Sequence, residues 1–196
     1  MLTIRGICKS FDGRPVLENV SFDFPEAAVT ALRGPSGCGK TTLINIILGL
    51  LAPDAGDVLM PSGARTAAVF QEDRLIEHFS AARNVRLTAP SSVPDEQIHS
   101  ALSELGLAQE GEKRVSEFSG GMRRRVAVIR AVLYQPQILL LDEPFKGLDE
   151  EMRAKTAAFL SRACARATIV LVTHDETEAA LMGATAELDL GGKEES

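Results

Sequence analysis

A glycine-rich segment has the residue types and the spacing of a phosphate-binding loop. Residues 34–41 read Gly-Pro-Ser-Gly-Cys-Gly-Lys-Thr, which matches G-x-x-x-x-G-K-[ST] at every fixed position. Glycines let backbone N–H groups approach phosphate oxygens, Lys40 offers a positive charge to the β- and γ-phosphates, and the Thr41 hydroxyl suits Mg²⁺. The residues expected to contact the phosphates of a nucleotide are Gly34, Pro35, Ser36, Gly37, Cys38, Gly39, Lys40, Thr41 and Thr42. A glycine turn with a chance lysine is the alternative, but the loop lies between a β-branched strand and an amphipathic helix, which argues against it.

Two adjacent carboxylates end an apolar strand further along the chain. Residues 138–141 are Ile-Leu-Leu-Leu, and Asp142 and Glu143 follow them. Ligands bind at the carboxyl ends of strands in open α/β sheets, so both side chains should face the phosphate loop. Asp142 can then hold Mg²⁺, usually through water, and Glu143 can take the proton of an attacking water. A surface Asp-Glu pair at a strand end is the alternative.

His174 follows another predicted strand, residues 168–173, and should leave the sheet at the same edge. A contact with the γ-phosphate is geometrically reasonable, and from spacing alone a structural role is equally open. The other two histidines, His78 and His99, have no comparable context and are interpreted as surface residues.

Ser119, Gly120 and Gly121 form a second candidate anion site. Serine is a good helix cap, and two glycines expose backbone N–H groups at a helix start. One chain does not need two such sites for one γ-phosphate, so a head-to-tail pair of chains, each covering the nucleotide of the other, is the economical explanation. An ordinary helix cap is the alternative.

Composition limits the class of protein. The chain has 196 residues, enough for one sizeable domain, with 45% hydrophobic and 24% charged residues and a net charge of −6. The acidic balance argues against a broad nucleic-acid-binding face, and the basic stretch 123–125 is interpreted as support for the electrostatics near a partner's nucleotide. Three cysteines without metal-type spacing suit a reducing compartment. Neither a membrane span nor a signal peptide is expected.

Strands alternate with helices, which predicts an α/β fold with a mainly parallel sheet. Strands are expected at 2–6, 16–24, 28–33, 64–70, 138–141, 168–172 and 184–190. The predicted helices cover an apolar stripe from Leu43 to Leu50, then residues 95–105, 121–134, 150–164 and 175–182. Pro53 and Gly56 should mark the end of the first of these helices, and residues 191–196 should be a frayed polar tail. Residues from about 72 to 135 are interpreted as a small helical subdomain inserted in a single domain, 1–196.

With these motifs in this order, nearly the whole chain resembles the ATP-binding cassette (ABC) ATPases. The resemblance implies a P-loop NTPase core with an N-terminal antiparallel β subdomain and a small helical subdomain. The segment 118–122, Phe-Ser-Gly-Gly-Met, corresponds to the family signature, which is usually Leu-Ser-Gly-Gly-Gln. Residues 147–149 match the loop whose aspartate crosses the dimer interface.

The family pattern also assigns roles to single residues. It implies that Phe11 stacks on adenine, that Gln71 senses Mg²⁺ and the attacking water and links to the transport partner, and that His174 is the switch histidine. The implied catalytic set is Glu143, His174, Gln71 and Lys40, and the implied metal set is Thr41, Gln71 and Asp142.

Weaker features are similar to the nitrate, sulfonate and taurine importer group. These are residues 70–75, Phe-Gln-Glu-Asp-Arg-Leu, and 141–145, Leu-Asp-Glu-Pro-Phe. Glu77 and His78 stand in a region where that group usually has Pro-Trp, and Lys146 stands where small residues are common.

The resemblance implies an ATPase subunit that binds ATP and Mg²⁺ and powers transport through a separate membrane permease. The implied arrangement is a head-to-tail homodimer or pair of ATPase subunits at the cytoplasmic face of the membrane, with an extracytoplasmic solute-binding protein and no nucleic acid. Import is favoured over export. A non-transport ATPase of the same fold, acting in DNA maintenance or translation, and a small-molecule kinase are the alternatives; the former usually needs a longer chain, and the latter has no use for Ser119, Gly120 and Gly121.

Three apolar residues follow Gln71 in a charged stretch, namely Leu75, Ile76 and Phe79. One hypothesis is that they line a groove that receives a short helix of the permease. The alternative is that they pack the helical subdomain.

Overall fold

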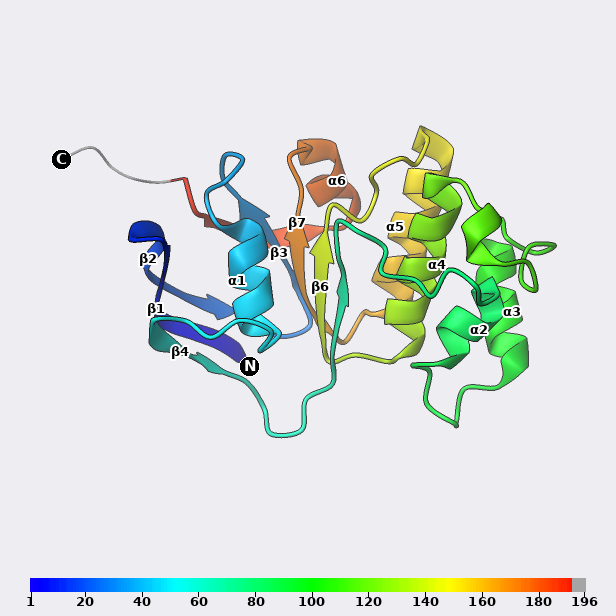
Figure 1. Cartoon of the computed structure of the whole chain (residues 1–196), viewed down its shortest axis with the longest axis horizontal. Helices are drawn as coiled ribbons and strands as arrows, with labels where there is room; N and C mark the ends of the chain where they lie inside the picture. The colour runs from blue at the N-terminus through cyan, green and yellow to red at the C-terminus, as the bar shows by residue number, and fades with distance from the viewer. Residues whose placement is uncertain (192–196) are drawn as a thin grey trace.

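The computed structural model describes residues 1–191 and contains two sheets (Figure 1). The larger sheet has the strand order β5-β6-β7-β3-β8, and all its neighbouring strands are parallel. Its strands are β3 (Val29–Arg33), β5 (Thr66–Val69), β6 (Ile138–Asp142), β7 (Thr168–Val172) and β8 (Ala184–Asp189). The predicted α/β class with a mainly parallel sheet is confirmed. Of the tail expected at residues 191–196, residues 192–196 lie outside the described part of the chain.

The parallel sheet is buried on both faces because consecutive side chains of its central strands point to opposite sides. Leu139, Leu141 and Leu171 belong to one apolar cluster, whereas Leu140 and Val170 belong to another. Helix α1 (Lys40–Ile47) covers the second cluster, and helices α4 (Gly120–Leu133) and α5 (Glu150–Ala163) cover the first (Figure 1). A wholly apolar run such as Ile138–Leu141 is therefore what a doubly covered strand requires.

The smaller sheet is antiparallel, with the order β2-β1-β4. Its strands are β1 (Leu2–Phe11), β2 (Arg14–Phe24) and β4 (Ala55–Leu59). Strands β1 and β2 are joined at Asp12 and Gly13, which both have positive φ angles, of 50° and 73°. Apolar residues of β1 and β2 pack in the same cluster as α1, so this sheet supports the helix that follows the phosphate loop.

Strand β4 was not predicted, and the expected end of the first helix was wrong. The helix ends at Ile47, with Gly49 in the left-handed conformation, and Leu50 is 62% exposed rather than part of a buried stripe. Gly56 lies inside β4, where an added Cβ would come within 2.4 Å of the carbonyl oxygens of Arg5 and Gly6. This glycine is therefore required by the close approach of β1 rather than by a helix end.

The chain between β5 and β6 is helical. It holds α2 (Ala81–Arg86), α3 (Asp95–Glu104), the 3₁₀ turn η1 (Val115–Glu117) and α4, and α2 and α3 lie outermost in Figure 1. Helix α2 was not predicted, because six residues are too few for a recognisable apolar period. Its fully buried Asn84 accepts a hydrogen bond from the backbone N–H of Ile76 at 2.8 Å and donates to the carbonyl of Ile76 at 3.1 Å, so α2 fixes the preceding loop.

The last helix, α6 (Glu176–Leu181), lies between β7 and β8. The bounds of α5, α6 and β8 lie within one residue of those predicted. Within residues 1–191, none of the helices is both long enough and apolar enough to cross a bilayer.

Candidate functional site

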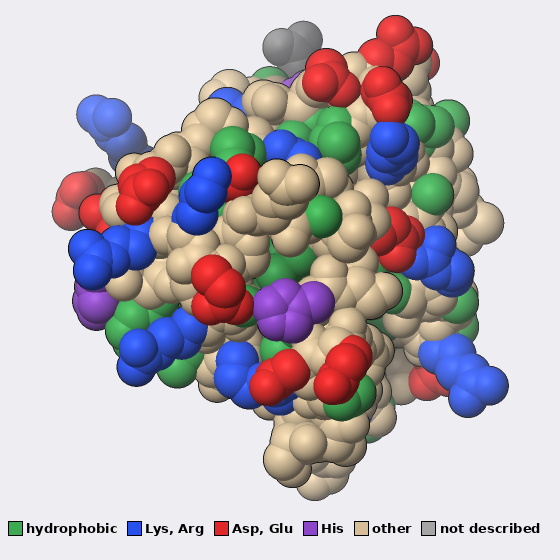
Figure 2. All heavy atoms as spheres, turned by 90° about the vertical axis from the view of Figure 1, so that its right-hand side faces the viewer, with side chains coloured by type: hydrophobic (Ala, Val, Ile, Leu, Met, Phe, Trp, Pro, Cys, Tyr) green, Lys and Arg blue, Asp and Glu red, His purple; other side chains and the backbone are tan. Residues whose placement is uncertain are grey.

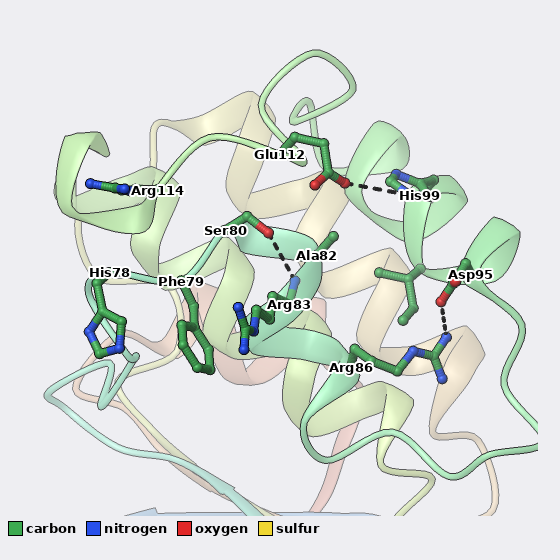
Figure 3. A pocket seen from close by; sticks show the side chains of 11 residues that line it. His78, Phe79, Ser80, Ala82, Arg83, Arg86, Asp95, His99, Glu112 and Arg114 are labelled. Atoms are coloured by element: carbon green, nitrogen blue, oxygen red, sulfur yellow. Dashed lines mark hydrogen bonds and ion pairs between the residues drawn. The ribbon is translucent and has the colours of Figure 1, made fainter.

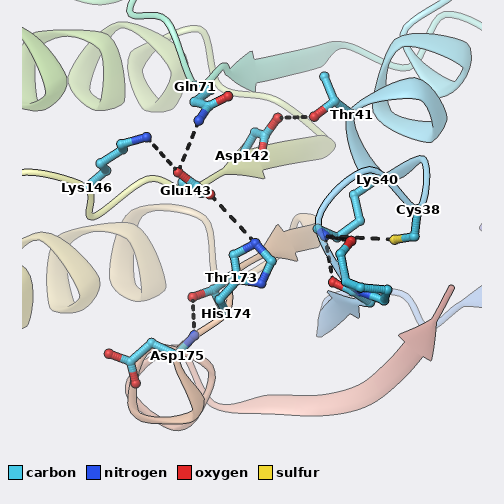
Figure 4. A network of polar contacts seen from close by, with 12 residues as sticks. Cys38, Lys40, Thr41, Gln71, Asp142, Glu143, Lys146, Thr173, His174 and Asp175 are labelled. Atoms are coloured by element: carbon cyan, nitrogen blue, oxygen red, sulfur yellow. Dashed lines mark hydrogen bonds and ion pairs between the residues drawn. The ribbon is translucent and has the colours of Figure 1, made fainter. Parts of the chain in front are cut away.

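The predicted site residues converge at one edge of the parallel sheet, because β6, β7 and β3 are neighbours and end there. A cavity of about 210 Å³ opens at this edge, and Figure 4 shows the polar contacts around it. Its lining residues are Ser36, Gly37, Gly39, Lys40, Thr41, Thr42, Gln71, Asp142, Glu143, Val172 and His174. The structure thus brings together the residues assigned to metal binding and proton transfer and most of those assigned to phosphate binding. Gly34, Pro35 and Cys38 of the loop are not among the lining residues.

The phosphate loop is already folded around the Lys40 ammonium. Lys40 is buried, and its Nζ donates to the carbonyl oxygens of Gly34 at 2.7 Å and Pro35 at 2.8 Å. Gly39 precedes α1 with a φ of 105°, and a Cβ there would clash with Val16 and Leu17 of β2 at 2.9 and 2.7 Å. Only glycine fits this position, so β2 helps to set the path of the loop.

Thr41 and Asp142 present two hard oxygen atoms to the cavity. The Thr41 hydroxyl donates to Asp142 Oδ2 at 3.0 Å. Burial raises the pKa of the Asp142 carboxyl above its ordinary value, although the Thr41 hydrogen bond acts in the opposite direction. A bound cation would offset this burial, so the pair fits a Mg²⁺ ion whose other ligands are waters and phosphate oxygens. In the described part of the chain no three His, Cys, Asp or Glu side chains cluster as a metal site of their own.

Glu143 lines the cavity and has a left-handed backbone conformation, with a φ of 50°. Its backbone N–H donates to the Val172 carbonyl at 3.0 Å, so the main chain is anchored to β7. Gln71 Nε2 lies 3.5 Å from Glu143 Oε2, and His174 Nε2 lies 3.8 Å from Oε1. Lys146 Nζ, which was not predicted as a site residue, lies 3.2 Å from Oε2 (Figure 4).

The signature segment lies outside the cavity of its own chain. Ser119 caps α4, because its hydroxyl accepts a hydrogen bond from the Met122 backbone N–H at 3.3 Å. Phe118 is buried in the core cluster that underlies α4 and α5. A Cβ at Gly120 would meet nothing within 4 Å, whereas a Cβ at Gly121 would come within 2.8 Å of the Gly147 carbonyl oxygen. The helix start is therefore open on one side and tightly packed on the other.

Phe11 ends β1 and also does not line the cavity. Its side chain is 45% exposed, and Lys9 Nζ lies 5.6 Å from the centre of its ring. An exposed aromatic face is available there for stacking.

The basic stretch 123–125 makes contacts within this chain, and whether it also supports a partner's nucleotide stays a prediction. Arg124 is only 4% exposed, and its guanidinium donates to the carbonyl oxygens of Phe70 and Gln71. Its Nε also lies 3.3 Å from Asp73. The sequence contains one signal for this role: position 124 falls on the buried face of α4, where an apolar residue would be expected.

Arg130, two turns further along α4, donates to the carbonyls of Asp73 at 3.0 Å and Arg74 at 2.8 Å. Arg125 donates to Leu105 and Gly121, and thereby joins α3 to the start of α4. Helix α4 therefore carries both Ser119 at its start and the hydrogen bonds that hold the segment containing Gln71.

A second hollow, of about 450 Å³, lies over α2 and α3 (Figure 3). Phe79 lies under the Arg83 guanidinium at 3.9 Å and beside the His78 ring at 4.8 Å. Ile76 is 37% exposed, whereas Leu75 packs against the core. Of the three apolar residues assigned to a groove, the structure thus places Phe79 in this hollow and Leu75 against the core. Figure 2 shows basic and acidic side chains interspersed over this end of the molecule.

A parallel sheet covered on both faces, with a phosphate loop, a metal-type Thr-Asp pair and a strand-end glutamate at one edge, defines a P-loop nucleotide-binding domain. The family model described as "ABC transporter" matches residues 17–146. The chain belongs to this family.

Relatives and solved structures agree with this assignment. The chain is 37% identical to a sulfate/thiosulfate import ATP-binding protein of Burkholderia mallei, over 91% of this chain and 56% of that protein. It is 39% identical to an aliphatic sulfonates import ATP-binding protein of Streptomyces avermitilis, over 91% of this chain and 69% of that protein. The chain therefore spans little more than half the length of some curated relatives it matches.

A dimeric ATP-binding cassette in a post-hydrolysis state with ADP and Pi superimposes with a TM-score of 0.87 and 25% identity, over 97% of this chain and 94% of that chain. The ATP-binding subunit of an ABC transporter superimposes with a TM-score of 0.89 and 25% identity, over 97% and 86% of the two chains. The predicted fold class, a P-loop core with an antiparallel β part and a helical part, is confirmed by these neighbours.

Proposed function

We propose that this chain is the ATP-binding and ATP-hydrolysing subunit of an ABC importer. One observation carries the proposal: Lys40, Thr41, Asp142, Glu143 and His174 lie around one cavity at the carboxyl edge of the sheet. The import ATP-binding proteins among the relatives support the same activity. The helical subdomain at about 72–135 would transmit conformational change between the nucleotide site and the membrane permease.

ATP would bind with its phosphates on the loop 34–42. Lys40 must then exchange the Gly34 and Pro35 carbonyls for phosphate oxygens, which keeps its charge compensated throughout. Thr41 and Asp142 would hold Mg²⁺, which supplies neutralisation of the charge that develops on the phosphates. Phe11 would stack on the adenine ring.

Hydrolysis would use Glu143 as the general base for an in-line attack of water on the γ-phosphate. A base placed in this way contributes about 10²- to 10⁴-fold to the rate. Gln71 and His174 flank the Glu143 carboxylate, so both are placed to orient the water and to stabilise charge on the γ-phosphate.

Ser119, Gly120 and Gly121 would complete the site of a second subunit. They do not line the cavity of their own chain, yet they expose backbone N–H groups at the start of the long helix α4. The dimeric cassette among the structural neighbours supports a head-to-tail pair in which each signature segment faces the partner's nucleotide.

The partner in the membrane would be a separate permease that contacts the hollow formed by Phe79, Arg83 and their neighbours. This places the subunit at the cytoplasmic face of the membrane, and import would require an extracytoplasmic solute-binding protein. The relatives are named for sulfate or thiosulfate, for aliphatic sulfonates and for spermidine or putrescine, so they support import as a class rather than one solute.

The substitution Glu143→Gln tests the proposal. It removes the base but keeps the size of the side chain, so steady-state ATP hydrolysis should fall at least about 100-fold. The nucleotide should remain bound, and the protein should run as a dimer on size exclusion in MgATP but not in MgADP. A variant that hydrolyses ATP at the normal rate, or a monomer that phosphorylates a metabolite, would contradict the proposal.

The permease contact has its own test. Ile76→Asp places a charge on an exposed side chain beside the hollow, so the isolated subunit should keep its stability and its ATP-dependent dimerisation. Co-purification with the co-expressed permease should be lost. Glu151→Lys on α5 serves as a control for a surface charge change, because none of the residues that line the hollow belongs to α5, and it should leave co-purification intact.

A further inference from the structure

We propose that Lys146 is a positioning residue for Glu143: it anchors one carboxylate oxygen so that the other is presented to the attacking water. The proposal rests on the proposed function, because it concerns the same reaction. Lys146 Nζ lies 3.2 Å from Glu143 Oε2, and Glu143 is its one carboxylate partner among the described residues.

The two carboxylate oxygens have different surroundings. Oε2 accepts from Gln71 at 3.5 Å and is paired with Lys146, whereas Oε1 has, among residues 1–191, only His174 at 3.8 Å. The oxygen with the weaker contact is therefore the one free to accept a proton. A carboxylate can turn about its terminal bond with little resistance, so an anchor on one oxygen defines the direction of the other.

Lys146 holds the carboxylate from outside the cavity. It does not line the cavity, its side chain is 56% exposed, and in Figure 4 it lies on the side of Glu143 away from Lys40 and Thr41. The ammonium can therefore remain in place while phosphates occupy the loop. A cation that lined the cavity would instead be drawn to the phosphates of the nucleotide and away from Glu143.

The backbone fixes the place from which Lys146 reaches Glu143. The Lys146 N–H donates to the Glu143 carbonyl at 3.2 Å, and the Leu148 N–H donates to the Phe145 carbonyl at 3.1 Å. Phe145 is fully buried in the core cluster. This turn fixes the backbone of Lys146, so fewer side-chain conformations have to be restricted when the ion pair forms. The Lys146–Glu143 pair can therefore orient the Glu143 carboxylate although the pair is partly exposed to solvent.

Steady-state kinetics of Lys146→Met and Lys146→Arg test the proposal. Lys146→Met should lower kcat for ATP hydrolysis roughly 3- to 10-fold and leave KM for ATP within about 2-fold, because orientation of the base acts on the chemical step. Lys146→Arg keeps the cation and should recover most of the rate. Lys155→Met removes a similar exposed pair with Glu151 on α5 and should leave kcat unchanged.

A double-mutant cycle separates positioning from a general structural effect. With Glu143 already replaced by Gln, Lys146→Met should cause no further loss of the residual rate and no change in ATP-dependent dimerisation on size exclusion. An unchanged or raised kcat in Lys146→Met, or an equal loss in the Glu143→Gln background, would overturn the proposal. If the wild-type protein does not hydrolyse ATP, the proposed function fails instead, and the two failures are therefore distinguishable.

Discussion

At the scale of single residues, the phosphate loop holds its shape with its own lysine. The Lys40 ammonium donates to two carbonyls of the loop it belongs to, and Cys38 Sγ lies 3.8 Å from the same nitrogen. These contacts hold the lysine inside the loop, and they are the ones that phosphate oxygens would replace.

Two of the cysteines should differ in alkylation, Cys38 in the phosphate loop and Cys164 in the core. Cys38 is half-buried in the phosphate loop, and its Sγ lies 3.8 Å from Lys40 Nζ, so its reaction with iodoacetamide should change when MgATP draws the ammonium to the phosphates. Cys164 is buried, and burial raises the pKa of its thiol to about 11, so it should not react in the folded protein. Peptide mass spectrometry after labelling with and without MgATP measures both; equal labelling of Cys38 in the two conditions would contradict the placement of the nucleotide.

The Cys164 thiol also gives a stability prediction with a definite sign. Its pKa rises from 9.0 to about 11 on folding, so the stability it contributes is complete below about pH 9 and is lost as the pH rises from 9 towards 11. The free energy of unfolding, measured with urea, should fall between pH 8 and pH 10. This fall should be smaller in Cys164→Ala than in the wild-type protein. An identical pH dependence in the two proteins would show that the thiol is not the cause.

At the scale of elements, α4 organises the segment that follows β5. Arg124 and Asp73 form a pair that is largely buried, and burial raises the pKa of Asp73 although three arginines, led by Arg124, oppose the shift. Arg123 lies next to Arg124 in sequence but makes only a half-exposed pair with Glu77 at 2.9 Å. The two neighbouring arginines should therefore differ greatly in their contribution to the stability of the fold.

Arg124→Met and Arg123→Met form a matched pair of variants. Arg124→Met leaves Asp73 buried without its partner and releases the carbonyls of Phe70 and Gln71, so it should cost about 3 kcal/mol of unfolding free energy. Arg123→Met should cost less than about 1 kcal/mol. Urea denaturation of both variants measures the difference, and equal losses would contradict the assignment of Arg124 to the interior.

The sequence predicts those elements whose local pattern agrees with their final packing. The apolar run 138–141, the phosphate loop and α5 follow directly from residue order. Strand β4 was missed because Gly56 resembles a helix terminator, and its role depends on the approach of β1, which is distant in sequence. The contacts of Arg124 were missed for the same reason, because they depend on which segments the fold brings together. The pair of Lys146 with Glu143 spans only three residues, but it depends on the turn that begins at Glu143 with a φ of 50°, which the residue order does not reveal.

At the scale of the whole molecule, Gly120 of the signature segment should matter only in the dimer. A side chain at Gly120 would meet nothing within 4 Å in the single chain, so Gly120→Ala should leave the unfolding free energy within about 0.5 kcal/mol of the wild type. The same change should weaken ATP-dependent dimerisation and hydrolysis if the partner's nucleotide approaches this helix start.

Size exclusion in MgATP, with Glu143→Gln as the background, measures this effect. Gly121→Ala is the contrast, because its Cβ would meet the Gly147 carbonyl oxygen and should lower the stability of the isolated chain as well. If Gly120→Ala still dimerises normally, the head-to-tail arrangement is wrong.

The hydrogen bonds from α4 to the segment 70–74 have one further consequence. Arg124 and Arg130 hold the carbonyl oxygens of Phe70, Gln71, Asp73 and Arg74, and every amino acid carries the same carbonyl. The path of this segment is therefore largely independent of the side chains it displays. Side chains on this segment can therefore be exchanged without moving the backbone that places Gln71 beside Glu143.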